Sequence, residues 1–211
     1  ATAMTAGPVY AALSPQDALA VPMAPSFAAW VHCVLPFVAL GGRLVFQPRF
    51  DPDAYLDLLE AERVTVAALV PTLWRMVLPG LSRRDLPALR VGMFSGEPGT
   101  PELVQALTGR FAAVRSVYLA SEGGCGAGIV ATEADLVRPG MAAAAGRPVP
   151  GADARVIDPD APGLVDVAPG ETGEIALTGP SLSPGYRGDA ARTAGRFRNG
   201  WWRTGDLGRI G

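Results

Sequence analysis

The chain has 211 residues, of which 49% are hydrophobic, and this is enough to bury a substantial core in one domain or in two small ones. The formal net charge is −2, so nothing in the composition favours nucleic acid or an anionic membrane as a partner. All 18 basic residues are arginines, which excludes every mechanism that needs a lysine from within these residues.

Neither a membrane span nor a secretion signal is expected. The best candidate for a span, at 27–40, is shorter than a bilayer-crossing helix and contains His32 and Pro36. No basic segment precedes an apolar run and a small-residue cleavage site. The two cysteines, Cys33 and Cys125, form no CxxC pair, so a reduced, cytoplasmic setting is the simplest expectation.

The first two-thirds of the chain alternates segments of strand and helix character. Strands are expected at 43–46, 65–70, 90–94 and 114–118, and helices from Pro52, over 72–78 and from Pro101. Asp51 and Thr100 supply N-caps for the first and last of these helices, and each is followed by a first-turn proline. Repeated strand–helix units with apolar strands predict an α/β fold with a mostly parallel sheet covered by helices.

The pattern of residues in the sequence changes after about Arg138. Helical periodicity disappears, and short strand candidates at 154–158, 174–178 and 201–204 are separated by Pro/Gly turns. Asn199-Gly200 is a strong signal for a two-residue hairpin turn. The sequence therefore predicts an α/β subdomain over 1–145 and a small antiparallel β subdomain, a distorted barrel, over 146–211.

Two polar loops follow consecutive strands of the expected sheet. Ser95-Gly96-Glu97-Pro98 comes after one strand, and Tyr118-Leu119-Ala120-Ser121-Glu122 ends the next. In parallel sheets, ligands bind beyond the carboxyl ends of the strands, so both loops are expected at one ligand-binding edge. A Ser-Glu pair can contact phosphate and hold a divalent metal, and Asp206 follows a tight Thr-Gly turn from which it could accept bonds from a sugar diol. These features indicate a nucleotide site.

A second nucleotide pattern offers an alternative. The stretch 126–131 fits the GxGxxA pattern of dinucleotide-binding proteins, which would make the protein a nicotinamide-dependent oxidoreductase. That fingerprint requires an apolar strand directly before it, and 121–125 is not apolar.

Five short strings, taken in order, resemble the adenylate-forming (AMP-binding) superfamily, which includes acyl- and aryl-CoA ligases, luciferases and the adenylation domains of peptide synthetases. They lie at 95–98, 116–122, 146–148, 173–175 with 185–186 after it, and 202–206. One such string is weak, whereas five in the right order and spacing are specific. The resemblance runs over 21–210 and implies the later part of the large N-terminal domain of a longer enzyme.

The resemblance also implies roles for residues around the nucleotide. Tyr118 would stack against the adenine of ATP or AMP, and the backbone of Gly96, Glu97 and Pro98 would line the other side of the ring. Ser116 would lie near the adenine amino group. Asp206 would accept hydrogen bonds from both ribose hydroxyls.

The chemistry implied is the activation of a carboxylic acid. Ser121 would contact the α-phosphate, and Glu122 would bind Mg²⁺, a cation that commonly takes one protein carboxylate together with phosphate oxygens. The acid and ATP would give acyl-AMP and pyrophosphate, and a thioester would then form on coenzyme A or on the phosphopantetheine of a carrier protein. Catalysis of this kind depends on alignment and on charge neutralisation along the phosphates.

The stretch 22–36 bears on the acid. Ala28 stands where amino-acid-activating relatives place an Asp for the substrate ammonium. Together with Ser26, Phe27 and Trp30, it is expected to form an apolar, uncharged pocket suited to an aryl or fatty acid. His32, the only histidine, is expected to be a packed core residue.

Departures from the family pattern support a different alternative. Leu119 replaces the glycine that usually follows the aromatic residue, and the phosphate-binding loop and the lysine-bearing C-terminal domain are not among these residues. The chain alone is therefore expected to be inactive. A degenerate, non-catalytic adenylation-like module within a multidomain synthase is the alternative that these departures leave open.

Overall fold

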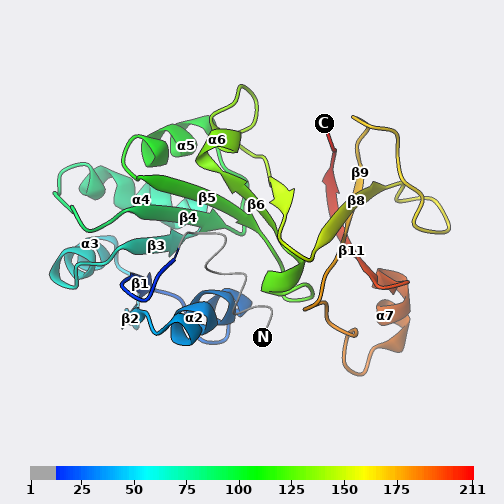
Figure 1. Ribbon diagram of the computed structural model, residues 1–211, viewed down its shortest axis with the longest axis horizontal. Coiled ribbons are helices and arrows are strands. Elements are labelled where there is room, and N and C mark those ends of the chain that lie inside the picture. Colours follow the sequence, from blue (N-terminus) through cyan, green and yellow to red (C-terminus); the bar gives the residue numbers. More distant parts are fainter. Residues whose placement is uncertain (1–12) are drawn as a thin grey trace.

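The computed structural model describes residues 13–211, which form two β-sheets joined by a short connection (Figure 1). The larger sheet has seven strands in the order β2-β1-β3-β4-β5-β6-β7, and the smaller has four in the order β10-β11-β9-β8. The α/β fold expected from the sequence is confirmed, including the antiparallel β unit that follows it.

The larger sheet is parallel over its first five strands, because each of them pairs with its neighbours in the same direction. β6 and β7 then extend it in antiparallel fashion. Its strands are β1 (Ala18–Val21), β2 (Arg43–Phe46), β3 (Val66–Leu69), β4 (Val91–Ser95), β5 (Ala113–Tyr118), β6 (Ile129–Thr132) and β7 (Arg147–Pro148).

Helices cover both faces of this sheet. The helices of the described residues are α2 (Ala28–Leu40), α3 (Pro52–Ala61), α4 (Pro71–Leu81), α5 (Pro101–Thr108), α6 (Glu133–Leu136) and α7 (Ala190–Arg196). α3, α4 and α5 pack on one face, and α2 lies on the other (Figure 1). The N-caps predicted at Asp51 and Thr100 are confirmed, since their side chains accept from the amides of Ala54 at 2.9 Å and Leu103 at 3.3 Å. Within 13–211 no helix is both long enough and apolar enough to cross a bilayer.

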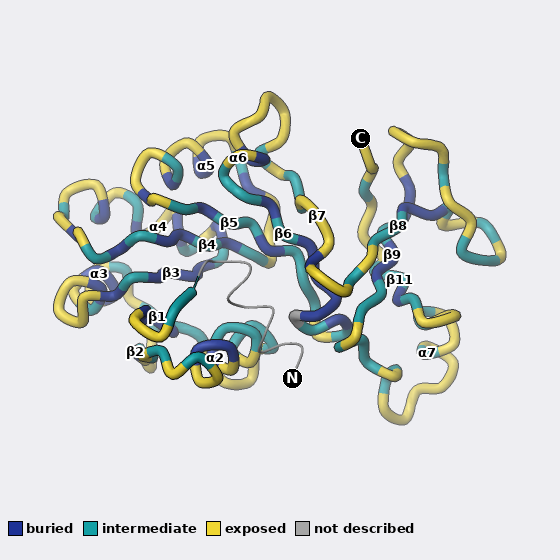
Figure 2. Tube along the Cα trace, in the orientation of Figure 1, coloured by how far each residue is buried: buried dark blue, intermediate teal, exposed yellow. Residues whose placement is uncertain are grey.

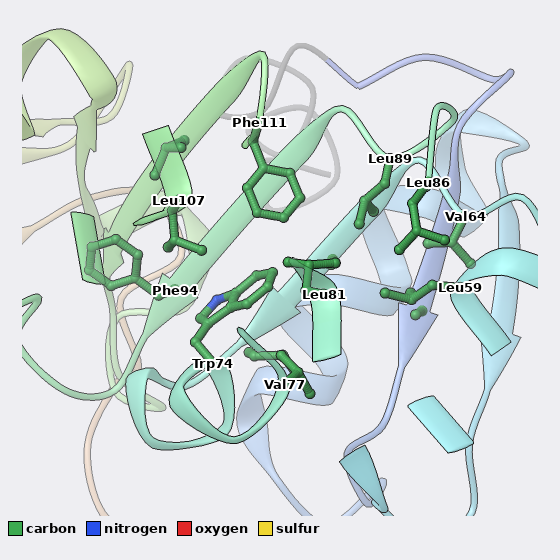
Figure 3. Packing of buried hydrophobic residues seen from close by; sticks show 14 of the residues in the cluster. Leu59, Val64, Trp74, Val77, Leu81, Leu86, Leu89, Phe94, Leu107 and Phe111 are labelled. Atoms are coloured by element: carbon green, nitrogen blue, oxygen red, sulfur yellow. The ribbon is translucent and has the colours of Figure 1, made fainter. Parts of the chain in front are cut away.

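The main core lies between the sheet and the α3–α5 layer, where the central strands are buried (Figure 2). Trp74 is fully buried there, and its ring meets that of Phe111 edge-on at 5.4 Å (Figure 3). The indole N–H of Trp74 donates to the carbonyl of Met93 at 2.8 Å, so the one polar atom of this large side chain is satisfied. The packing fixes α4 against β4, and thereby fixes the end of β4 from which the first polar loop leaves.

The smaller sheet consists of β8 (Asp153–Ile157), β9 (Gly173–Thr178), β10 (Phe197–Arg198) and β11 (Trp201–Gly208). Asn199 and Gly200 connect β10 to β11 with φ angles of 50° and 78°. Two positive φ values in a two-residue loop are the requirement of a type I′ turn, so the predicted hairpin is confirmed.

Two details refine the sequence analysis. β7 still pairs with β6 in the larger sheet, and the smaller sheet begins only at Asp153. The division into subdomains 1–145 and 146–211 stays a prediction.

The GxGxxA stretch at 126–131 forms the end of a 3₁₀ turn and then strand β6, which runs antiparallel to β5. The strand–turn–helix context of a dinucleotide fingerprint is therefore absent from this stretch.

Candidate active site

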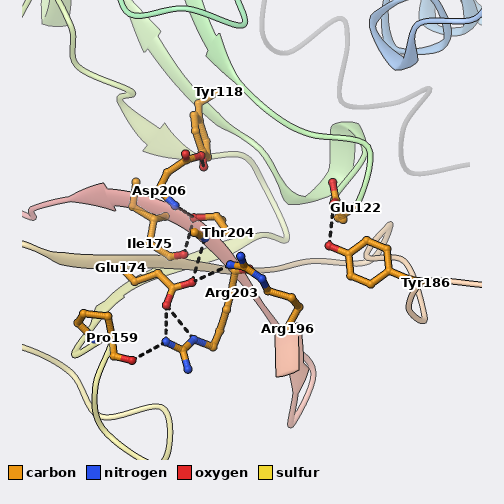
Figure 4. Close-up of polar contacts among 11 residues, drawn as sticks. Tyr118, Glu122, Pro159, Glu174, Ile175, Tyr186, Arg196, Arg203, Thr204 and Asp206 are labelled. Atoms are coloured by element: carbon orange, nitrogen blue, oxygen red, sulfur yellow. Dashed lines mark hydrogen bonds and ion pairs between the residues drawn. The ribbon is translucent and has the colours of Figure 1, made fainter. Parts of the chain in front are cut away.

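The two polar loops leave the same edge of the larger sheet. β4 and β5 are adjacent and parallel, and Ser95 at the end of β4 pairs with Val117 of β5. The segments 96–98 and 119–122 therefore emerge side by side, as the topological argument predicted. The smaller sheet brings a third segment, the turn 204–206 of β11, to the same place (Figure 4).

Tyr118 and Asp206 connect the two sheets. The hydroxyl of Tyr118 donates to Oδ2 of Asp206 at 2.5 Å, across 88 positions of sequence. Burial, followed by this hydrogen bond, raises the pKa of Tyr118 above its ordinary value, so the phenol remains a donor. Asp206 itself is exposed, which leaves its carboxylate open to a ligand approaching from solvent. The structure thus places together the residues predicted to contact adenine and ribose.

The backbone around Asp206 is held in an unusual shape. Gly205 has a φ of 83°, and an added Cβ there would lie 2.7 Å from Nη1 of Arg196. The Gly205 N–H donates to Glu174 at 2.9 Å, and the amide of Asp206 donates to Oγ1 of Thr204 at 3.0 Å. Thr204 in turn donates to the carbonyl of Ile175 at 2.8 Å. This network orients the Asp206 side chain toward Tyr118.

Glu174 is the centre of the network and is only 5% exposed. Its carboxylate accepts from Nε of Arg203 at 2.8 Å, and also from the Nη2 group of the same arginine. Arg196 adds a weaker contact at 3.4 Å (Figure 4). Two arginines therefore compensate one buried carboxylate, as a buried charge requires. Sequence reasoning treated 173–175 as a family landmark and missed this role, although a Glu within an apolar strand was a signal for it.

Glu122, the predicted metal ligand, is half-buried and held from the side of the smaller sheet. Its Oε1 accepts from the hydroxyl of Tyr186 at 2.8 Å, and its backbone carbonyl accepts from Ser183 at 2.7 Å (Figure 4). The guanidinium of Arg192 lies 4.2 Å from the centre of the Tyr186 ring. Ser121 is exposed beside Glu122. Sequence reasoning did not identify the role of Tyr186.

The donor set around Glu122 fits Mg²⁺ only together with a ligand. Among residues 13–211 there is no cluster of three or more His, Cys, Asp or Glu side chains that could hold a metal. Mg²⁺ commonly uses one or two carboxylates and takes its remaining ligands from phosphates and water. A single oriented carboxylate is therefore compatible with a magnesium ion that arrives with a nucleotide, and not with a cage made by the protein.

The predicted adenine loop is exposed at Gly96, Glu97 and Pro98. Glu97 accepts from the hydroxyl of Thr72 at 2.9 Å, which ties the loop to the start of α4. Ser116 lies on β5 two residues before Tyr118, so the two side chains leave the same face of the strand.

An apolar pocket opens beneath this edge, between α2 and the ends of β3, β4 and β5. The empty space between its lining residues amounts to about 640 Å³, a figure that includes open solvent at its mouth. Its lining is Leu13, Leu19, Ala29, His32, Cys33, Pro36, Phe37, Ala68, Leu69, Met93, Phe94, Ser95, Val117 and Leu119. Burial lowers the pKa of His32, which favours a neutral imidazole in this lining.

None of the four predicted pocket residues belongs to this lining. Ser26 is exposed, Phe27 is 65% exposed, and Trp30 is half-buried and stacks on Phe46 at 6.4 Å. Ala28 is half-buried at the first turn of α2. The residues of α2 that line the pocket are instead Ala29 and the residues one and two turns after it, namely His32, Cys33, Pro36 and Phe37. A substrate role for Ser26, Phe27, Ala28 and Trp30 stays a prediction.

The chain is similar in sequence to known CoA ligases and in structure to an amide bond synthetase. The sequence profile described as "AMP-binding enzyme" matches residues 1–187. An indoleacetate–CoA ligase of Aromatoleum aromaticum is 34% identical over 82% of this chain and 33% of its own length. A feruloyl-CoA synthase of an Amycolatopsis species is 32% identical over 92% of this chain and 39% of its own.

A solved structure agrees with these sequence matches. The amide bond synthetase McbA of Marinactinospora thermotolerans superposes with a TM-score of 0.86 at 31% identity, over 100% of this chain and 42% of that one. The chain spans about a third to two-fifths of the length of the curated relatives that it matches. By the profile match, the sequence identity and the fold, the chain belongs to the AMP-binding enzyme family, whose curated relatives here are acyl- and aryl-CoA ligases.

Proposed function

We propose that this chain is part of an ATP-dependent enzyme that activates an aryl or fatty carboxylic acid as an acyl-AMP for thioester formation. The observation that carries the proposal is that Tyr118, Asp206 and Glu122 lie at the edge of the sheet where Ser95 and Leu119 line an apolar pocket. Family membership supports the reaction class. The apolar lining supports an acid that carries no charge apart from its carboxylate. The thiol acceptor is coenzyme A or the phosphopantetheine of a carrier protein.

The reaction has two displacements. A carboxylate oxygen of the acid attacks the α-phosphorus of ATP, and pyrophosphate leaves with the electron pair of the broken P–O bond. A thiol, as its thiolate, then attacks the acyl carbon, and AMP leaves. Because the acyl carbon is first joined to a good leaving group, the second step has a lower barrier than direct thioester formation.

The residues of this chain supply binding and orientation. Tyr118 positions the adenine, Asp206 accepts from the ribose hydroxyls, and Ser121 contacts the α-phosphate. Glu122 would hold a magnesium ion bound to the phosphates, and such an ion would neutralise charge that builds up on the leaving pyrophosphate. Holding the acid and the α-phosphate in register turns a two-body encounter into a reaction within one complex.

Pyrophosphate exchange tests the proposal. In the protein that carries this chain, acid-dependent exchange should occur, and Glu122→Ala should lower its rate by about 10²-fold or more, the usual effect of removing one preorganised electrostatic contact. Glu171→Ala, an exposed carboxylate on a surface turn, is the matched control and should leave the rate unchanged. Undiminished exchange in Glu122→Ala would remove the metal assignment.

A non-catalytic module is the second candidate, and the presence of Leu119 in the pocket lining favours it. On that reading the protein binds AMP but shows no acid-dependent exchange at any magnesium concentration. The 211-residue chain by itself should show no exchange under either reading. A nicotinamide-dependent enzyme would instead bind NAD and not ATP analogues.

A further inference from the structure

Leu119 and Tyr118 are neighbours in sequence but belong to different parts of the site. Side chains alternate between the two faces of a strand, so Val117 leaves β5 on one face and Tyr118 on the other, and Leu119 is the first residue after the strand. Val117 and Leu119 line the apolar pocket under α2, whereas Tyr118 bonds to Asp206. Leu119 therefore lies on the pocket side of the boundary between the pocket and the nucleotide residues.

The same alternation identifies the neighbours of Leu119. Met93 and Ser95 occupy equivalent positions on β4, and the pairing of Ser95 with Val117 sets the two strands level. Leu119 is two residues beyond Val117, toward the carboxyl edge of the sheet, and Ser121 follows two residues later. Along the chain, Leu119 therefore lies between the pocket residue Val117 and Ser121, the residue proposed to contact the α-phosphate.

We propose that Leu119 is a specificity-determining residue that excludes acids with a branch next to the carboxyl group. The proposal rests on the proposed function, because it assumes that the pocket holds the acid. A leucine side chain occupies space at the pocket end where the carboxyl-bearing carbons of the substrate lie. Straight-chain acids, and aryl acids joined through an unbranched linker, fit past it, whereas an α-alkyl or α-aryl group collides with it.

Isomeric acids test this inference without changing composition. Octanoate and 2-ethylhexanoate contain the same atoms, as do 3-phenylpropionate and 2-phenylpropionate, and only the second member of each pair is branched at the α-carbon. Affinities of the protein that carries this chain for all four are measured by isothermal titration calorimetry. For the wild-type chain we expect the unbranched member to bind at least about tenfold more tightly, which is the discrimination typical of one misplaced methylene.

Three variants decide the role of Leu119. Leu119→Ala should bring the ratio of affinities within each pair close to one, and Leu119→Phe should raise it above the wild-type value. Leu35→Ala removes the same three carbons from the outer side of α2, where Leu35 is 39% exposed, and should leave the ratio unchanged. The melting temperature of each variant is measured alongside, and if Leu119→Ala does not fold, the opposite shift in Leu119→Phe carries the test.

The outcomes separate this inference from the proposed function. If the acids bind but the wild-type ratio is near one, or if neither Leu119 variant changes it, Leu119 does not set specificity and the proposed function stands. If none of the four acids binds but the protein shows pyrophosphate exchange with another acid, this inference fails and the proposed function stands. If no acid supports exchange, the proposed function fails as well.

Discussion

Replacing Glu174 with alanine removes the carboxylate that holds the Asp206 turn and compensates two arginines. The carboxylate is 5% exposed and accepts from Arg203 Nε at 2.8 Å and from the Gly205 N–H at 2.9 Å. Removing one partner of a buried ion pair costs about 3–5 kcal/mol. The side chains of Arg203 and Arg196 are 22% and 43% exposed and regain some hydration, so we expect the lower end, about 3 kcal/mol.

The assay is thermal unfolding followed by circular dichroism. At about 2–4 °C per kcal/mol for a chain of this size, Glu174→Ala should lower the melting temperature by about 6–12 °C. Glu174→Gln keeps the side-chain volume and one acceptor oxygen. Its melting temperature should lie between those of the wild type and Glu174→Ala. Asp166→Ala is the control, because its 2.7 Å pair with Arg155 is 57% exposed on the aspartate side and is worth about 0–1 kcal/mol. A Glu174→Ala melting temperature equal to that of the control would refute the reasoning.

Three further predictions follow from single contacts. Gly205→Ala should lower the free energy of unfolding by about 1–2 kcal/mol, because the residue has a φ of 83° and its Cβ would crowd Arg196; unchanged urea denaturation would contradict this. Tyr186→Phe should raise the Mg²⁺ concentration for half-maximal pyrophosphate exchange about 2- to 12-fold, the equivalent of one hydrogen bond to Glu122, with no change in the KM for the acid. Burial alone would raise the pKa of Asp17, but hydrogen bonds from Arg90, Thr65 and Ser14 outweigh it and hold that pKa below 3.8. A lowered native pKa contributes stability that is present above pH 3.8 and is lost as the pH falls through the native value. The free energy of unfolding of Asp17→Asn, plotted against pH, should therefore fall less steeply than that of the wild type below pH 3.8 and run parallel to it above.

The parts of the fold that the sequence predicted carry strong local signals. Asp51 and Thr100 cap their helices through bonds to amides three residues on, and Asn199-Gly200 closes its hairpin through positive φ angles. Such signals need no knowledge of distant residues. Strand β1, in contrast, was not predicted, because Ala18 and Ala20 have low strand propensity. Its pairing with β2 and β3 makes it a strand.

In the candidate site, too, some features were predictable from the sequence and others depend on distant contacts. Tyr118 and Asp206 were predicted to act on one nucleotide, and the structure brings them together. The supporting contacts of Glu174 and Tyr186 span 22 to 64 positions and could not be read from spacing. The pocket face of α2 was not predictable either, because the helix is apolar on all sides: Val31 and Val38 are 41% and 60% exposed. Without a polar face, the helical period does not indicate which side meets the sheet.

The most direct test of the central claim is a titration of the isotopically labelled chain with AMP, followed by amide NMR. The account predicts that the resonances of 96–98, Tyr118 and 204–206 shift together with one binding curve, and that Asp206→Ala weakens binding without unfolding the chain. If AMP shifts resonances elsewhere, or if Asp206→Ala binds AMP as tightly as wild type, this sheet edge is not the nucleotide site.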